Sequence, residues 1–269
     1  MKWSKHFRVK PGQAVRLADW DATWTGSFKD KDDARDGLRE NIARMDELQY
    51  LLYAQRKYAL LIVLQGMDAS GKDGTIRHVM SGLNPQSCYV QAFKEPTPEE
   101  LDHDFLWRIH HAVPGRGEIG IFNRSHYEDV LVVRVHDLVP RRVWGQRYDQ
   151  IKAFERILTE NNVVILKFFL NTSRDEQRVR LQDRLKDPTK RWKISPADFA
   201  ERKYWSAYQQ AYEEALTKCN AAHAPWFVIP ADHRWFRNWA VSQIIVEALE
   251  GLKMKFPRPK FNAAHIRIP

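Results

Sequence analysis

The hydrophobic positions along the chain predict an alternation of strands and helices. Five short apolar runs each predict a buried strand: Leu60–Leu64, Cys88–Phe93, Glu118–Phe122, Val163–Leu170 and Trp226–Pro230. The segments between these runs carry helical patterns instead. Strands that are separated by helices favour a parallel sheet with both faces covered. We therefore predict an α/β fold with a five-stranded parallel sheet between two layers of helices.

Several helices can be placed by their spacing and their caps. A long amphipathic helix is predicted over Asp32–Arg56, and another helix over Val143–Leu158. The sequence Thr97-Pro98-Glu99-Glu100 is a capping box that predicts a helix to about Ala112. A cap signature at Ser195–Asp198 predicts a helix to about Lys218. The last helix carries a stripe that we interpret as core, formed by Trp235, Trp239, Ile245 and Leu249.

The turn after the first strand carries a phosphate-binding pattern. Gly66 to Lys72 reads G-x-x-x-x-G-K at a strand-to-helix junction. In this pattern backbone N–H groups close on phosphate oxygens, the helix N-terminus adds partial positive charge, and the Lys ammonium reaches the phosphates. The next position holds Asp73, where Ser or Thr normally contacts Mg²⁺, so a carboxylate or a water molecule would have to hold the ion. A plain strand-to-helix turn is the alternative interpretation.

A run of polar and ring-bearing residues, Asn123 to Asp129, follows the third strand. Ligands of open α/β sheets bind beyond the carboxyl ends of the strands, so we expect this run to face the Gly66–Lys72 turn. A second strand often ends in a carboxylate that holds Mg²⁺. Here that position is Asn123, and Glu128 or Asp129 could supply the charge. The alternative is a solvated loop.

The segment Arg178–Lys193 is strongly basic. It carries two acidic residues, Asp183 and Asp187, against seven basic ones: Arg178, Arg180, Arg184, Lys186, Lys190, Arg191 and Lys193. Like charges four apart on a helix, such as Arg180 and Arg184, are unfavourable unless an anion lies between them. We therefore predict a helical lid, at about residues 174–205, that closes over phosphates. A solvated charged hairpin is the alternative.

Composition narrows the classes of function. The net charge of +9 implies a polyanionic partner, which could be nucleic acid, an anionic membrane or a phosphate-rich substrate. Cys88 and Cys219 have no metal-ligand spacing and no disulfide framework, which suits a reducing cytoplasm. No apolar run reaches the roughly 18 residues of a membrane span, so we expect a soluble protein. The adjacent His110 and His111 do not suit a zinc site, and the absence of G-x-S-x-G disfavours a serine hydrolase.

In combination these segments resemble the type-2 polyphosphate kinase family. The residues that carry the resemblance are GMDASGKDGTI at 66–76, NPQSC at 84–88, the stretch 105–135 with NRSHYED, KRWKIS from Lys190, and 224–239. The resemblance implies a thymidylate-kinase-like P-loop fold with a lid. We expect an N-terminal arm and helix over 1–57, a phosphotransferase domain over 58–252 and a tail over 253–269.

The resemblance also implies an activity. Family members transfer phosphoryl groups reversibly between inorganic polyphosphate and nucleotides with Mg²⁺, for which Mn²⁺ could substitute. Asp in place of Ser or Thr after the loop lysine is typical of the family. ADP-specific members tend to read D-R-S-W-Y-N where this chain reads N-R-S-H-Y-E, so Glu128 points to conversion of AMP to ADP as well as ADP to ATP. A cytoplasmic homodimer or homotetramer is expected, without nucleic-acid or membrane partners.

Site residues follow by position in the family motifs. Asp68, Lys72 and Arg124 are the expected catalytic residues, and Asp68 and Asp73 the expected metal ligands. The expected phosphate contacts are Gly66, Ala69, Ser70, Gly71, Lys72, Asp73, Gly74, Arg124, Arg134, Arg178, Lys190, Arg191 and Lys193. The expected nucleotide contacts are Asn84, Arg108, Asn123, Tyr127 and Glu128. Two alternatives remain: an ATP-dependent nucleotide or nucleoside kinase of the same fold, and a nucleic-acid-binding protein with a vestigial phosphate loop.

Overall fold

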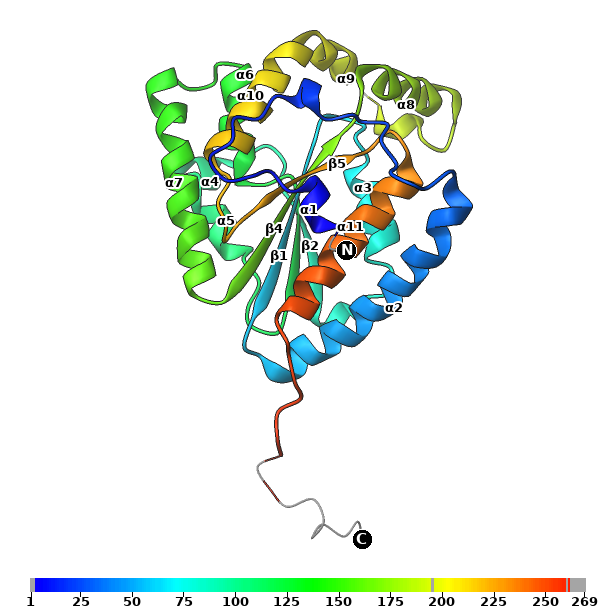
Figure 1. Ribbon diagram of the computed structural model, residues 1–269. Helices are drawn as coiled ribbons and strands as arrows, with labels where there is room; N and C mark the ends of the chain where they lie inside the picture. Colours follow the sequence, from blue (N-terminus) through cyan, green and yellow to red (C-terminus); the bar gives the residue numbers. More distant parts are fainter. Residues whose placement is uncertain (1–2, 195, 260, 262–269) are drawn as a thin grey trace.

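A five-stranded sheet forms the centre of the computed structural model, which describes residues 3–194, 196–259 and 261 (Figure 1). Its strands are β1 (Ala59–Gln65), β2 (Cys88–Ala92), β3 (Ile119–Asn123), β4 (Val163–Asn171) and β5 (Trp226–Pro230). They lie in the order β2-β3-β1-β4-β5, and all neighbouring pairs are parallel. The prediction of a five-stranded parallel sheet is confirmed.

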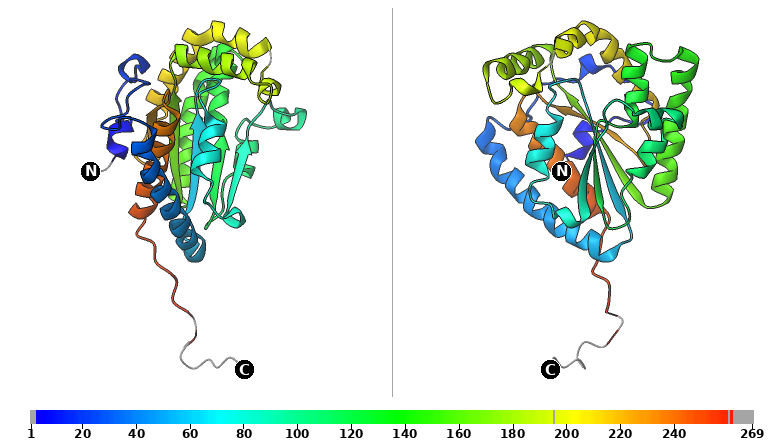
Figure 2. Two further views of the ribbon diagram at one scale, coloured as in Figure 1. Left: turned by 90° about the vertical axis from the view of Figure 1, so that its right-hand side faces the viewer. Right: turned by 180° about the vertical axis from the view of Figure 1, so that it is seen from behind.

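Helices cover both faces of this sheet (Figure 2). One layer holds α2 (Lys31–Gln55), α3 (Lys72–Val79) and α11 (Arg234–Gly251), and the other holds α7 (Arg141–Glu160) and α10 (Trp205–Lys218). The side chains of β1 alternate between the two: Leu61 and Val63 enter the core under α7 and α10, whereas Leu60 and Ile62 enter the core under α2 and α11. The three-layer α/β/α prediction is therefore confirmed.

The N-terminal segment packs along β5. It contains α1 (Ser4–Phe7) and the 3₁₀ turn η1 (Leu17–Asp19). The Val9 N–H donates to the Trp226 carbonyl over 2.9 Å, and Phe7 and Val9 are buried. This placement agrees with an arm on the main domain, while the domain boundaries themselves stay a prediction. No helix in the described residues combines the length and apolar character that crossing a membrane requires.

The helix predicted from Thr97 to Ala112 is instead two short helices, α4 (Pro98–Asp102) and α5 (Trp107–His111). The capping box at Thr97 is present as predicted. The helix ends because His103 is extended and the Asp104 carboxylate accepts a hydrogen bond from the Leu106 N–H, which begins a new turn. Apolar spacing alone does not reveal this interruption.

Helical segments beyond β4 form the predicted charged hairpin. They are α8 (Arg174–Lys186), η4 (Arg191–Lys193), α9 (Pro196–Glu201) and η5 (Arg202–Tyr204), which lead into α10. The predicted cap at Ser195 lies outside the described residues. The other short elements are η2 (Pro85–Ser87), η3 (His126–Val130) and α6 (Val132–Val135).

A buried ionic cluster lies between β4 and α7. The Lys167 ammonium donates to Glu155 Oε2 at 2.6 Å, to the Tyr127 hydroxyl at 2.9 Å and to the Cys219 carbonyl at 2.6 Å. Burial alone would raise the pKa of Glu155, but pairing with Lys167 and hydrogen bonding to His126 leave that pKa below its usual value. The cluster cross-links the sheet to the α7 layer.

Candidate active site

The phosphate loop lies at the carboxyl end of β1, and its backbone needs the residues that the motif supplies. Gly66 and Gly71 have φ values of 152° and 101°, and Ala69 adopts the left-handed region at 61°. A Cβ at Gly66 would lie 2.7 Å from Ser70 Oγ and 2.9 Å from the Leu170 carbonyl. Glycine is therefore required there both by conformation and by space.

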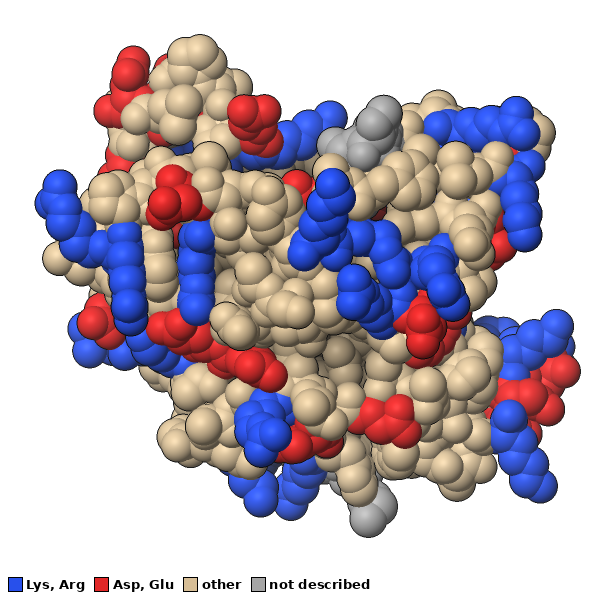
Figure 3. Space-filling view, turned by 90° about the horizontal axis from the view of Figure 1, so that it is seen from above, with Lys and Arg blue, Asp and Glu red and all other residues tan. Residues whose placement is uncertain are grey.

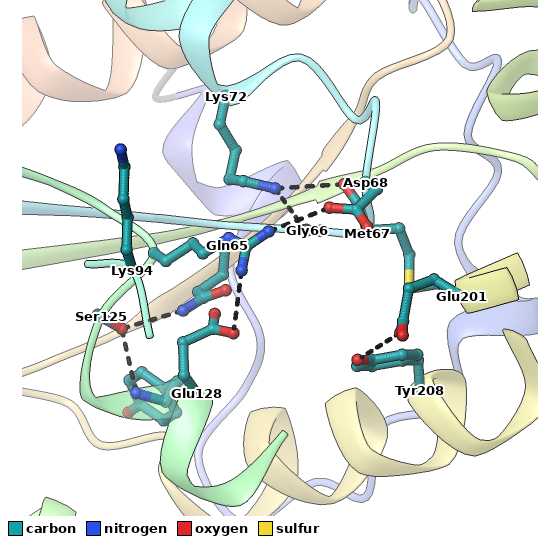
Figure 4. Close-up of polar contacts among 12 residues, drawn as sticks. Gln65, Gly66, Met67, Asp68, Lys72, Lys94, Ser125, Glu128, Glu201 and Tyr208 are labelled. Carbon is teal, nitrogen blue, oxygen red and sulfur yellow. Dashed lines mark hydrogen bonds and ion pairs between the residues drawn. The ribbon is translucent and has the colours of Figure 1, made fainter. Parts of the chain in front are cut away.

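Lys72 begins α3 and turns back over the loop. Its ammonium donates to the Gly66 carbonyl at 2.7 Å and to the Met67 carbonyl at 3.2 Å, as Figure 4 shows. Burial and the charge of Arg124 lower the pKa of Lys72 to about 8, against the attraction of Asp68, Glu128 and Asp73. A bound phosphate would give this ammonium a negatively charged partner.

Arg124 sits at the end of β3 and contacts two carboxylates. Its guanidinium lies 3.2 Å from Asp68 Oδ1 and 3.9 Å from Glu128 Oε2. Arg124 has a φ of 64°, which is unusual for a residue with a side chain and is typical of functional sites. Burial raises the pKa of Glu128, and Arg124 and Lys72 oppose only part of that shift.

Asp73 and Asn123 join α3 to the end of β3. The Asn123 amide donates to Asp73 Oδ1 at 2.8 Å, and the Lys193 ammonium lies 3.9 Å from Asp73 Oδ2. Asp68 and Asp73 thus place two carboxylates on the rim of the loop. Within the described residues no three His, Cys, Asp or Glu side chains gather as a metal site. This arrangement fits Mg²⁺, which commonly uses one or two protein carboxylates and completes its coordination with water and substrate phosphates.

These residues open into a cleft of about 670 Å³. Its charged lining consists of four acidic residues, Asp68, Asp73, Glu95 and Asp183, and nine basic ones: Lys72, Lys94, Arg124, Arg180, Arg184, Lys190, Lys193, Arg234 and Arg237. The excess of cations makes the cleft suitable for a polyanion. Seen from above the carboxyl ends of the strands, Lys and Arg atoms gather near the middle of this face (Figure 3).

The structure brings most of the expected phosphate and metal residues to this cleft. Its lining includes Asp68, Ala69, Gly71, Lys72, Asp73, Gly74, Asn123, Arg124, Lys190 and Lys193. Gly66 and Ser70 belong to the loop but do not line the cleft, and Ser70 is fully buried. Arg184, Lys190 and Lys193 come from the hairpin, so hairpin cations and the phosphate loop share one cleft.

Three expected phosphate contacts lie elsewhere. Arg134 is bound by Glu214 and the Tyr148 hydroxyl and stacks over Trp144. Exposed Arg178 pairs with Asp175 at 3.5 Å, and Arg191 donates to the Leu185 carbonyl. Basic side chains spaced along a helix can pair with acidic or carbonyl groups nearby. The spacing of charges therefore did not identify the cations that face the loop.

Three of the expected nucleotide contacts do not line the cleft. Asn84 caps η2 before β2, at the end of the sheet remote from the loop. Tyr127 is buried and bonded to Glu155 and Lys167. Arg108 is largely buried and held by Glu100 and the Lys94 carbonyl, next to the cleft but not in its lining. Of the remaining two, Asn123 lines the cleft, and Glu128 lies behind Arg124.

Arg180, which the sequence pairs with Arg184 around a predicted anion, has partners within the protein. Arg180 is buried and bonds Glu176 and backbone carbonyls, so these acceptors offset its charge. Sequence reasoning missed Gln177, Arg234 and Arg237, which contact the loop or line the cleft. The last two begin α11 inside a matched family segment, but no spacing rule singles them out.

Comparison with known proteins agrees with this geometry. The sequence profile of the polyphosphate kinase 2 family matches residues 28–257. An AMP/ADP-polyphosphate phosphotransferase from Meiothermus ruber is 51% identical over 265 residues, which are 98% of this chain and 99% of that protein. An ADP-polyphosphate phosphotransferase from Rhodopseudomonas palustris is 45% identical over 94% of this chain and 92% of its own length.

A solved structure has the same fold. The crystal structure of polyphosphate kinase 2 from Arthrobacter aurescens superposes with a TM-score of 0.94 at 42% identity, and the match covers 98% of this chain and 94% of that one. The match of the profile and the near full-length similarity lead to one conclusion: the chain belongs to the polyphosphate kinase 2 family.

Proposed function

We propose that this protein catalyses the Mg²⁺-dependent, reversible transfer of the terminal phosphoryl group of inorganic polyphosphate to AMP and to ADP. The observation that carries the proposal is the shared cleft, in which Lys72 and the phosphate loop lie opposite Arg184, Lys190 and Lys193 of the hairpin. Family membership and the names of the two relatives support the same activity.

The charge of the cleft suits a chain of linked phosphates. Polyphosphate carries about one charge per residue, so it resembles a nucleic-acid backbone in its electrostatics. The cations of the cleft come from the loop, β3, the hairpin and the start of α11. A single phosphate could not reach from Lys72 to the hairpin cations Lys190 and Lys193, whereas an extended polyanion could lie between them.

Catalysis in this site would depend on positioning and neutralisation of charge. Phosphoryl transfer spreads negative charge over the equatorial oxygens of the transferred group. Lys72 and Arg124 would stabilise that charge, and the loop N–H groups would bind the oxygens. Asp68 and Asp73 would hold Mg²⁺, which, when bound, neutralises phosphate charge; Mn²⁺ could replace it. Asn123 orients Asp73, and Arg124 orients Asp68.

Use of AMP as well as ADP rests on Glu128 and on similarity. Glu128 lies 3.9 Å from Arg124 at the inner end of the site. The Meiothermus ruber relative is named for both nucleotides, and the one from Rhodopseudomonas palustris for ADP only. We therefore propose AMP and ADP as acceptors and ATP as the final product. Assembly into dimers or tetramers and a cytoplasmic location stay predictions.

The test is an assay without added ATP. Purified protein is incubated with Mg²⁺, polyphosphate and either AMP or ADP, and the nucleotides are separated by chromatography. The proposal expects ADP from AMP and ATP from ADP. If phosphorylation of AMP required ATP and ignored polyphosphate, the protein would be an ATP-dependent kinase instead. Lys72→Ala should lose turnover, which also separates the enzyme from a protein that only binds polyanions.

A further inference from the structure

Three consecutive carbonyls of the phosphate loop accept hydrogen bonds from side chains outside the loop. Gln177 Nε2 donates to the Asp68 carbonyl at 2.9 Å. Arg180 Nη1 donates to the Ala69 carbonyl at 3.0 Å and to the Ser70 carbonyl at 2.9 Å. Gln177 and Arg180 are three residues apart on α8, so they reach the loop from one face of one helix.

Arg237 holds the same loop from α11. Its Nη1 donates to the Ser70 carbonyl at 3.2 Å. A Cβ at Gly71 would lie only 1.9 Å from Arg237 Nη1. Arg237 is 2% exposed, and its other hydrogen-bond acceptor within the described chain is Asn238. Burying a cation without a carboxylate partner costs folding free energy. The position of Arg237 against Gly71 therefore indicates a role in function.

The direction of the carbonyls fixes the direction of the N–H groups. In a trans peptide the carbonyl and the following N–H point in opposite directions. Holding the Asp68 and Ser70 carbonyls therefore orients the N–H groups of Ala69 and Gly71. Neither N–H has an acceptor among the described residues, whereas the Ser70 N–H donates to the Met67 carbonyl. The two N–H groups are left for phosphate oxygens.

We propose that Gln177, Arg180 and Arg237 are positioning residues that preset the phosphate loop for transfer, without contacting phosphate themselves. Arg180 suits this role because its planar fork bonds several acceptors at once: Nη1 the two loop carbonyls, Nη2 the carbonyls of Ala231 and Asp232, and Nε Glu176. A lysine ammonium has no such fork. The proposal rests on the proposed function only for its kinetic part.

The same contacts fix both arms of the hairpin relative to the phosphate loop. Gln177 and Arg180 tie the first half of α8 to the loop. Arg202 Nη1 donates to Gln177 Oε1 at 3.0 Å. This bond connects the second arm of the hairpin to the clamp, the set of side chains Gln177, Arg180 and Arg237 that hold the loop carbonyls. The contacts thus hold both arms of the hairpin, at Arg180 and at Arg202, to the phosphate loop.

The experiment compares Gln177→Ala and Arg180→Lys with Gln182→Ala, an exposed glutamine on the same helix that does not line the cleft. Hydrogen–deuterium exchange of the peptide covering residues 66–72, thermal unfolding, kcat and KM for polyphosphate are measured. We expect the Ser70 N–H, which donates to the Met67 carbonyl, to exchange about tenfold faster in the first two variants, and their kcat to be lower by about ten- to a hundredfold. Gln182→Ala should match the wild type.

The proposal is overturned if loop exchange in Gln177→Ala equals that of the wild type, or if kcat of a folded variant stays within about twofold. Should Arg180→Lys not fold, Gln177→Ala decides alone, because it removes one amide and no charge. A wild-type protein without polyphosphate turnover would refute the proposed function. The exchange data would still decide whether the clamp orders the loop.

Discussion

The amide of Asn123 donates a hydrogen bond to the carboxylate of Asp73 over 2.8 Å, and so links the end of β3 to the first turn of α3. Asp73 stands where most phosphate loops have a hydroxyl, and Asn123 where a second strand often ends in a carboxylate. The pair thus exchanges the usual roles: the loop supplies the acid, and the strand supplies the group that orients it.

Replacement of Asn123 tests this orientation. In Asn123→Ala the Asp73 carboxylate loses its fixed donor, and we expect the Mg²⁺ concentration for half-maximal rate to rise by about tenfold, as is usual when a partner of a metal ligand is removed. The measurement is the initial rate against Mg²⁺ concentration at saturating polyphosphate. An unchanged Mg²⁺ dependence would show that Asp73 does not need Asn123 or does not bind the metal.

The hairpin cations should determine the salt dependence. Lys193→Ala removes one cleft cation, so KM for polyphosphate should rise and the slope of log KM against log salt concentration should fall by about one unit. Lys186→Ala is the matched control, because Lys186 is exposed on α8 and outside the cleft lining. Equal slopes for both variants would contradict a polyphosphate path past Lys193.

Glu128 should make stability depend on pH. Burial raises its pKa in the folded protein above the ordinary 4.5. The folded state therefore holds this proton to higher pH than the unfolded state, and stability falls as pH rises through that window. Glu128→Gln removes the effect, so its melting temperature relative to wild type should increase as the pH rises above 4.5. A constant difference would contradict this assignment.

Replacing only one partner of the Lys167–Glu155 pair should lower the free energy of unfolding. Their side chains are 0% and 1% exposed, so Lys167→Met leaves the buried Glu155 carboxylate without its ammonium partner. We expect a loss of about 3–5 kcal/mol of unfolding free energy in Lys167→Met. Adding Glu155→Gln should recover a large part of it. Urea unfolding of both variants and the wild type measures this, and additive losses would contradict the coupling.

The strands and the three-layer arrangement could be predicted from the sequence, because buried strands appear in it as continuous apolar runs. In β1 every position is apolar up to Gln65, and each boundary of the five predicted strands agrees with the observed one to within one residue. The broken helix at His103 was not accessible, because an aspartate that caps a new turn has no effect on apolar spacing.

The part of the site that lies in sequence motifs could be predicted from the sequence. Lys72, Asp73 and Arg124 lie within contiguous motifs, and they meet because neighbouring parallel strands end at the same edge. Charge runs were less informative: Arg178 faces solvent, and Arg180 faces backbone carbonyls. Tyr127 packs in the core and Asn84 caps η2, since a position within a motif does not say whether a side chain packs, caps or binds.

The most direct test is a crystal structure of the protein with polyphosphate and Mg²⁺. We expect consecutive phosphates that begin at the N–H groups of Ala69 and Gly71 and the Lys72 ammonium and continue to Lys190 and Lys193. Polyphosphate bound on another face, with the hairpin cations free of phosphate, would contradict it.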